Sequence, residues 1–280
     1  MTQELEKKVQ RAIKLIQSAS KIAIQNGCPK IEVAYSGGKD SDVILELTKM
    51  ANVPYRAIYK NTTIDPSGTI KHAIEMGAEI IRPKRTFFQI MAKAGFPNRL
   101  YRHCCRTLKE YKVLDYVVLG IRASESSKRA KYKEIEVCKV FSKKEKARHY
   151  YPILDWDNDD VESFLKERNI TCAPIYYDDN HVFHVERRLG CLCCPLASKG
   201  LRIKQFKKHP NMVKAYIRAG IKYLSTHDNK TTHKWHDVYE WFVYDVFYSD
   251  VPNKWEELNS GFLPPPNFKE FLENYFKINF

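Results

Sequence analysis

The chain has 280 residues, a formal net charge of +14 and 44% hydrophobic residues. This length allows one large or two modest domains with a hydrophobic core, and no apolar run approaches the ~18 residues of a membrane span. The excess of basic residues favours an anionic partner such as a nucleotide or a nucleic acid. The N-terminus lacks a signal-peptide pattern, so we expect a cytoplasmic protein with no membrane partner, in which at least some of the eight cysteines serve metal or redox chemistry.

The first half of the chain alternates between helix and strand. Residues 1–27 are predicted to form an amphipathic helix, since Leu5, Val9, Ile13 and Ile16 share one stripe and Gly27 is the expected stop. Further elements are expected as strands at 31–35, 55–59, 79–81 and 116–121 and as helices at 41–50, 68–77, 87–94 and 108–114. This alternation predicts an α/β fold with a doubly wound parallel sheet.

From about residue 150 the pattern changes. A helix is expected at 160–168, an irregular cysteine-bearing segment at 172–200, and mostly helix afterwards, including a strongly aromatic helix at 236–248 that we expect to serve packing. We therefore divide the chain into an N-terminal helix (1–27), a domain at 28–200 that contains the cysteine pattern and is expected to bind a nucleotide through the sequence SGGKDS at 36–41, and a helical, basic and aromatic C-terminal region (201–280).

Positive charge is concentrated in two stretches. Arg122–Arg148 is dense in Lys and Arg, and Leu201–Lys222 contains seven basic residues and no acidic one. Each stretch alone is as compatible with solvated surface as with a polyanion site. Two such stretches beside a nucleotide site favour the polyanion.

The strand at Ile31–Tyr35 runs directly into the sequence SGGKDS and then into a helix. Gly37 and Gly38 allow a tight turn and a close approach to a ligand, and the N–H groups at the start of the helix face an anion. Lys39, which we expect to be exposed, adds positive charge, and Asp40 can hold a magnesium ion. An ordinary polar turn is the alternative. The nucleotide-binding residues predicted here are Ser36, Gly37, Gly38, Lys39, Asp40 and Ser41.

This loop resembles the PP-loop of the N-type ATP pyrophosphatases, and residues 25–200 look most similar to the PAPS reductase family. Other shared segments are Asn61-Thr62-Thr63, Gly120-Ile121-Arg122, Pro152–Val161, and Pro174-Ile175-Tyr176 leading to Gly190-Cys191. The resemblance implies a sheet of the adenine-nucleotide alpha-hydrolase type that binds ATP with Mg²⁺. It implies nucleotide contacts from Thr62, Gly120 and Arg122, and catalytic roles for Lys39, Asp40 and Arg122.

The cysteines form the pattern Cys104-Cys105 followed by Cys191-x-x-Cys194. Four thiolates suit a [4Fe–4S] cluster or zinc, and adjacent cysteines favour the cluster, whose irons lie at separate corners. The pattern also resembles iron–sulfur sulfonucleotide reductases and DndC-type DNA-phosphorothioation enzymes. Buried or redox thiols are the remaining alternative. Cys193 is left over, as a core residue or a thiol beside the metal, and the isolated cysteines are interpreted as packing residues: Cys28, Cys138 and Cys172.

Three functions are compatible with these motifs. The first is an ATP pyrophosphatase that takes part in sulfur transfer to DNA or RNA, with a cysteine desulfurase or another sulfur-transfer protein as the expected donor. The second is an APS or PAPS reductase, but the nucleophilic cysteine that such enzymes carry near the C-terminus has no counterpart after Cys194. The third is a non-catalytic module that binds nucleotides or nucleic acid.

Overall fold

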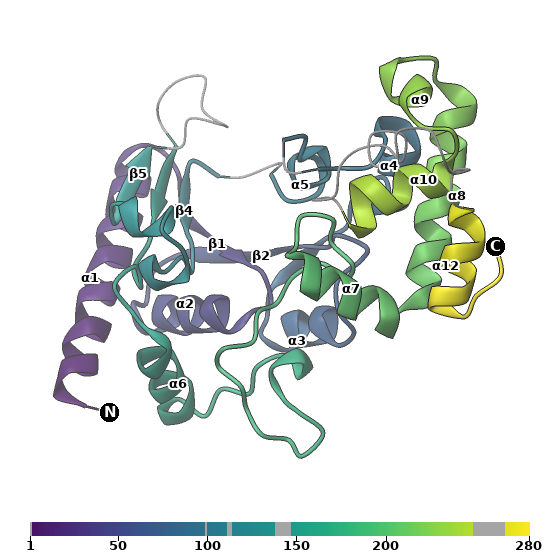
Figure 1. Cartoon of the computed structure of the whole chain (residues 1–280). Helices are drawn as coiled ribbons and strands as arrows, with labels where there is room; N and C mark the ends of the chain where they lie inside the picture. The colour runs from purple at the N-terminus through teal and green to yellow at the C-terminus, as the bar shows by residue number, and fades with distance from the viewer. Residues whose placement is uncertain (1, 99, 111–113, 138–146, 249–266) are drawn as a thin grey trace. The chain divides into compact units, whose positions relative to one another are not determined.

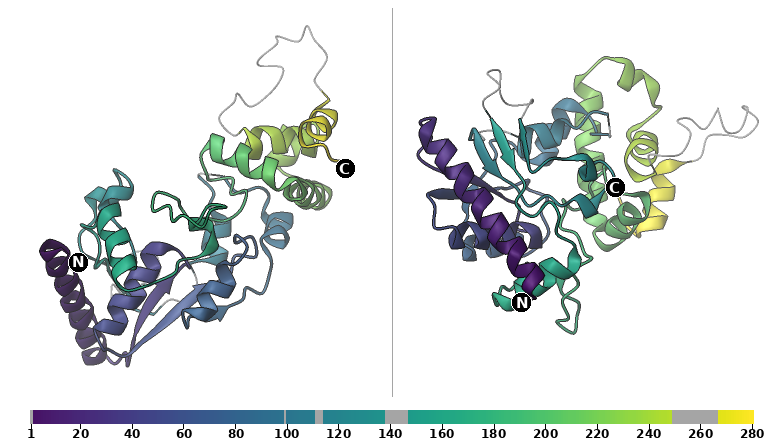
Figure 2. Two further views of the ribbon diagram at one scale, coloured as in Figure 1. Left: turned by 90° about the horizontal axis from the view of Figure 1, so that it is seen from below. Right: turned by 90° about the vertical axis from the view of Figure 1, so that its left-hand side faces the viewer.

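The computed structural model describes residues 2–98, 100–110, 114–137, 147–248 and 267–280. The chain divides into two compact units, which Figures 1 and 2 show in three views. Unit 1 comprises Met1–Asn61, Asp65–Arg82 and Glu110–Leu189, and unit 2 comprises Thr62–Ile64, Pro83–Lys109 and Gly190–Phe280. The boundary expected at residue 200 therefore falls inside unit 2.

Unit 1 is built on a six-stranded sheet with the order β3-β2-β1-β4-β6-β5. All neighbouring pairs are parallel except β5 with β6, which confirms the predicted α/β fold. The predictions missed β5 and β6, which form inside and at the end of the basic stretch 122–148. The strands are β1 (Ile31–Tyr35), β2 (Tyr55–Lys60), β3 (Glu79–Ile81), β4 (Tyr116–Val118), β5 (Ile135–Val137) and β6 (Arg148–Tyr150).

The helices of unit 1 cover the sheet with apolar side chains. In α1 (Gln3–Gln25) the predicted stripe is buried, and Leu5 and Ile16 belong to the same core as Val33 of β1. Figure 2 shows α1 in purple beside the sheet. The other helices of this unit are α2 (Lys39–Met50), α3 (Thr69–Glu75) and α6 (Asn158–Glu167), with short turns η1 (Ala123–Glu125), η2 (Arg129–Lys131) and η3 (Pro174–Tyr176).

Unit 2 is helical in its described residues and has its own aromatic core. The expected aromatic helix is present as α10 (Val238–Trp241) followed by the π-helical turn η4 (Phe242–Phe247). Trp241, Phe242 and Phe247 are buried, which confirms a packing role. The helix expected at 108–114 was wrong: Lys109, Glu110 and Leu114 are not helical, and 111–113 lie outside the described residues. The helix lies earlier in the chain, as α5 (His103–Leu108), and it ends in a turn at Lys109. The helical elements are α4 (Phe87–Ala94), α5 (His103–Leu108), α7 (Lys199–Lys208), α8 (Pro210–Thr226), α9 (Lys230–Lys234), α10 (Val238–Trp241), η4 (Phe242–Phe247) and α12 (Phe268–Phe276).

Among the described residues, no helix combines the length and the apolar character needed to cross a membrane.

Candidate functional site

The SGGKDS loop lies at the point where the strand order of the sheet reverses. β1 has β2 on one side and β4 on the other, so the chain segments that leave β1 and β4 emerge side by side at the carboxyl edge of the sheet. Open parallel sheets bind ligands in the crevice at this place. The turn after β4 fits tightly against the loop, since a Cβ added at Gly120 would lie 2.6 Å from the backbone oxygen of Asp40. The sheet therefore brings two sequence-distant predicted segments together.

Two glycines and two serines shape the loop. Gly37 has φ +76°, and a Cβ there would lie 2.7 Å from Thr69 Cγ2. The Gly38 N–H donates to Ser41 Oγ at 3.0 Å, and this hydroxyl donates back to the Gly38 oxygen at 2.7 Å. Ser36 Oγ lies 3.2 Å from Ser41 Oγ. The first turn of α2 is thus held in its bent shape by the loop's own hydroxyl groups.

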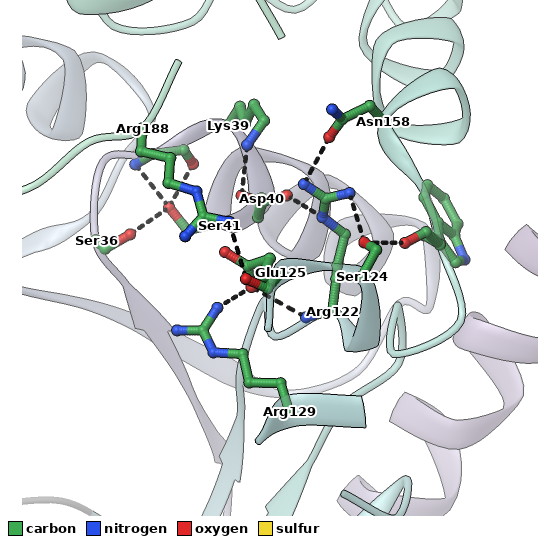
Figure 3. Close-up of polar contacts among 12 residues, drawn as sticks. Ser36, Lys39, Asp40, Ser41, Arg122, Ser124, Glu125, Arg129, Asn158 and Arg188 are labelled. Atoms are coloured by element: carbon green, nitrogen blue, oxygen red, sulfur yellow. Dashed lines mark hydrogen bonds and ion pairs between the residues drawn. The ribbon is translucent and has the colours of Figure 1, made fainter. Parts of the chain in front are cut away.

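The charged residues of the site form one network, drawn in Figure 3. Asp40 accepts hydrogen bonds from Lys39 Nζ at 2.9 Å and from Arg122 Nε at 2.7 Å. The Arg122 guanidinium also donates to Asn158 Oδ1 at 3.0 Å and to Ser124 Oγ at 3.4 Å. The expectation of an exposed Lys39 was wrong: only 3% of it is accessible, because the ion pair with Asp40 draws it inward.

A cavity of about 350 Å³ adjoins this network. Lys39, Arg122 and Arg188 contribute its positive charges, and Arg188 is also anchored by a hydrogen bond to the Glu125 oxygen at 3.0 Å. Arg188 could not be predicted from the sequence, because a lone arginine in an irregular segment carries no pattern. The remaining lining residues are Ser124, Glu125, Asp157, Asn158, Asp159, Val185 and Glu186.

The buried carboxylate of Asp42 stabilises the helix that follows the loop. Asp42, fully buried in α2, accepts from Tyr35 Oη at 2.5 Å and lies 2.9 Å from Nε2 of His72 in α3. Burial, together with the charge of Asp42, raises the pKa of Tyr35 far above its usual value, so the phenol remains a donor. Asp42 thereby ties the loop helix to β1 and α3.

The first cysteine pair lies on α5 in unit 2. Cys104 is buried and Cys105 is half-buried. A hydrogen bond between the two thiols raises the pKa of Cys104 and lowers the pKa of Cys105. Arg102 supports the Cys105 thiolate by donating to its Sγ over 3.8 Å. This contact favours the thiolate form of Cys105.

The second pair lies in the turn that begins at Gly190. Leu192 N donates to the Ile64 oxygen at 2.7 Å, and the Cys191 thiol donates to Thr62 Oγ1 over 3.5 Å. Thr62 therefore belongs to unit 2, whereas the other predicted nucleotide-binding residues lie in unit 1. Its expected contact with a nucleotide stays a prediction.

Cys193 is a core residue. Its side chain is fully buried, which raises the pKa of its thiol to about 12, and its backbone has φ +51°. Its N–H donates to Gln205 Oε1 at 2.9 Å, and its carbonyl accepts from Tyr216 Oη at 2.8 Å. This left-handed residue lies in the chain between Cys191 and Cys194. Tyr216, which no sequence pattern singles out, is a buried side chain that anchors the turn.

All four predicted ligand cysteines lie in unit 2 and carry free thiols. They interact electrostatically: Cys194 raises the pKa of Cys104, and Cys191 and Cys105 assist burial in raising the pKa of Cys194. Over the described ranges, no three His, Cys, Asp or Glu side chains form a group that could hold a metal as they stand. The donor set suits a cluster in its chemistry, and binding would require the thiols to close around it. Cys172 lies in the core of unit 1 and Cys28 packs against it, as expected, and Cys138 lies outside the described residues.

The fold and the loop define an α/β protein whose candidate site sits at the switch point of a mostly parallel sheet. The phosphoadenosine phosphosulfate reductase domain family matches residues 30–197, and the chain belongs to this family. Similarity extends to an uncharacterized protein of Methanocaldococcus jannaschii, 26% identical over 270 residues, which covers 87% of this chain and 55% of the relative. The chain spans about half the length of the curated relatives it matches.

Two solved structures are similar to parts of this chain. The PAPS reductase of Candida auris in a phosphate complex is 18% identical, with a TM-score of 0.42, over 62% of this chain and 90% of the other. The U34-tRNA thiolase NcsA of Methanococcus maripaludis with its [4Fe–4S] cluster is 15% identical, with a TM-score of 0.38, over 80% of this chain and 82% of the other.

Proposed function

We propose that this protein is an ATP pyrophosphatase of the PAPS reductase family that takes part in iron–sulfur-dependent sulfur transfer to nucleic acid. The observation that carries the proposal is the SGGKDS loop at the switch point of the sheet, with Lys39, Asp40 and Arg122 in one network beside a cavity. Such a loop at the start of a helix favours binding of phosphate groups.

The cavity contains both charge signs, as a magnesium nucleotide requires. Lys39, Arg122 and Arg188 suit the phosphates, and the carboxylates of Glu125 and Asp159 suit a hydrated Mg²⁺. Asp40 holds the two cations of the network in place and is a further candidate for the metal. These groups favour a nucleotide with its metal over a metal-free anion.

In the proposed reaction, ATP is split between the α- and β-phosphates and the acceptor is adenylated. Lys39 would offset the charge that develops on the α–β bridging oxygen, and Arg122 would contact a phosphate or the acceptor. Burial strengthens both interactions, because water is excluded from around Lys39 and Arg122.

Cys104, Cys105, Cys191 and Cys194 are proposed to hold a [4Fe–4S] cluster. When bound, such a cluster supplies sulfide or electrons for transfer of sulfur to the activated acceptor. The net charge of +14 supports a nucleic acid as that acceptor. A cysteine desulfurase or a comparable sulfur-transfer protein is the proposed donor.

The test is anaerobic purification with iron and sulfide analysis, followed by pyrophosphate release from ATP with and without nucleic acid. We expect Mg²⁺-dependent release, and we expect Asp40→Asn to lose most of it. Asp179→Asn makes the same charge change at an exposed aspartate of unit 1 and should retain it. A wild-type protein that binds ATP but releases no pyrophosphate with any acceptor contradicts the proposal.

The family match favours one second candidate, an APS or PAPS reductase. This reaction releases sulfite from the sulfonucleotide with a thiol reductant, and it needs no ATP. Sulfite release with no pyrophosphate release would select this candidate.

A further inference from the structure

Unit 2 contains a second cavity that the proposed ATP site does not use. It has a volume of about 630 Å³ and lies between α4 and α8, which pack side by side (Figure 1). On each helix the lining residues recur at helical spacing, so one face of each helix forms one wall. The lining residues are Lys84, Arg85, Phe88, Gln89, Ala92, Lys93, Ala215, Arg218, Ala219 and Lys222. We call this cavity the α4–α8 groove.

The rim of the groove is basic. Five exposed cations line it, no carboxylate does, and none of the five has an ion-pair partner among the described residues. A rim of one charge sign attracts an anionic ligand. The five are Lys84, Arg85, Lys93, Arg218 and Lys222.

The floor of the groove is small and apolar. The floor is open because its side chains are small: Ala92, Ala215 and Ala219. The half-buried ring of Phe88 forms part of the wall. Phe88 is held edge-on against Tyr216, with ring centroids 5.5 Å apart and the planes at 86°. A fixed aromatic ring beside cations offers a stacking surface for a base and charges for its phosphates.

The packing behind the groove keeps it open. Phe96, which follows α4, fits against α8 only because residue 220 is a glycine: a Cβ there would lie 2.7 Å from Phe96 Cζ. Phe87 and Phe96 both contact the Tyr216 ring, with centroids 5.8 Å and 5.9 Å away. The two walls are therefore fixed before any ligand binds, and the groove is preorganised.

We infer that the α4–α8 groove binds a single-stranded segment of nucleic acid, with phosphates at the cationic rim and a base on Phe88. This inference deepens the nucleic-acid part of the proposed function and rests on it. A free nucleotide would use only part of the rim, whereas a strand places successive phosphates along both helices. The groove residues lie outside the ATP network and supply a binding path for the acceptor.

The test is direct binding of fluorescently labelled oligouridine and oligothymidine, measured by anisotropy without ATP. The groove variant combines Lys93→Gln, Arg218→Gln and Lys222→Gln. We expect it to weaken binding on the order of tenfold or more and to make the slope of log affinity against log salt shallower by about 2, from about 0.7 per contact.

The matched control combines Lys7→Gln, Lys14→Gln and Lys21→Gln, three exposed lysines of α1. It removes the same charge from unit 1 and should change affinity less than threefold, well below the groove variant. Equal losses in the two triple variants overturn the groove as the site. Absence of oligonucleotide binding by the wild type at ~50 mM salt, where phosphate contacts are strong, also overturns it.

Phe88→Leu tests the stacking contact, because it keeps an apolar side chain against Tyr216. We expect about tenfold weaker binding of single strands and no change for a duplex, whose bases are already stacked. An equal effect on both, or none on either, contradicts a bound single strand. Because these assays need no turnover, binding without pyrophosphate release would reject the proposed function and leave the groove assignment standing.

Discussion

The charged side chains of the candidate site in unit 1 are held in place by hydrogen bonds to one another. The four predicted ligand cysteines of unit 2 influence one another, but they are not arranged around a common metal position. Asp40 is contacted by Lys39 and Arg122 within 2.9 Å. The thiols of unit 2 affect one another's pKa, but no three of them form a metal-holding group among the described residues.

The difference shows what each site needs from its ligand. The loop has its charges in place, so a nucleotide should bind with little change in backbone. The four cysteines would form a complete metal site only when the cofactor binds. Metal binding should therefore stabilise unit 2, because a ligand that binds only the folded state adds to its stability. The predictions below test this contrast from the largest expected effect to the smallest.

The largest effect is expected at Lys39. Under the proposed function, Lys39→Gln should lower pyrophosphate release on the order of 10²–10³-fold, because it would remove a preorganised charge next to the transferred group. Since Lys39 is buried against Asp40, we also expect a loss of about 1–3 kcal/mol in the free energy of unfolding. Lys49→Gln, at the exposed end of the same helix, is the control and should change neither activity nor thermal unfolding. Activity retained in Lys39→Gln places the chemistry elsewhere.

The second effect concerns the cofactor. Cys191→Ser should remove most of the iron and the brown absorbance from an anaerobic preparation, because a serine hydroxyl is a poor ligand for a cluster iron. Cys193→Ala should retain both, since Cys193 packs in the core and its backbone, not its thiol, anchors the turn. Stoichiometric zinc without iron in the wild type would reject the cluster in favour of zinc.

Alanine substitutions at two glycines test whether the SGGKDS loop is packed more tightly than the cysteine turn. Gly120→Ala should destabilise unit 1 by about 1–3 kcal/mol, because its Cβ would lie 2.6 Å from the Asp40 backbone. Gly190→Ala should be nearly neutral, because a Cβ there meets nothing within 4 Å. Chemical denaturation and pyrophosphate release measure both variants. An equal loss in the two would show that the loop is no more tightly packed than the cysteine turn.

The smallest effect is expected on α7. Replacing Lys204, Lys207 and Lys208 with Gln should weaken nucleic-acid binding similarly on all sequences and make the salt slope slightly shallower. The loss should be smaller than for the groove variant, because Lys207 Nζ already lies over the Tyr275 ring, 4.9 Å from its centroid. A loss larger than that of the groove variant would move the binding path from the α4–α8 groove to α7.

Part of the basic stretch 201–222 has a structural role that its composition did not reveal. Arg202 is 1% exposed and donates to the backbone oxygens of Pro195 and Ala197, both at 2.9 Å. It therefore helps to hold the cysteine turn. Charge density in a sequence indicates an electrostatic field but cannot distinguish a buried guanidinium from an exposed one.

The local sequence determined the elements whose signals are short-range. The strand at Ile31–Tyr35, the strand at Glu79–Ile81 and the helix at Phe87–Ala94 occur with the predicted bounds, because period and turn residues act over a few positions. The motif SGGKDS marks the start of a helix for the same reason. The family could be recognised because its residues fall in contiguous segments.

Only the tertiary structure decided which distant residues share a site. Arg188 reaches the cavity beside Lys39 from an irregular segment, and Tyr216 reaches the carbonyl of Cys193 from α8. The α4–α8 groove likewise combines two helical faces that are more than a hundred residues apart in the chain. Such pairings depend on how whole elements pack their apolar faces. Because the hydrophobic free energy of this packing is non-directional, no local pattern of residues encodes the partner.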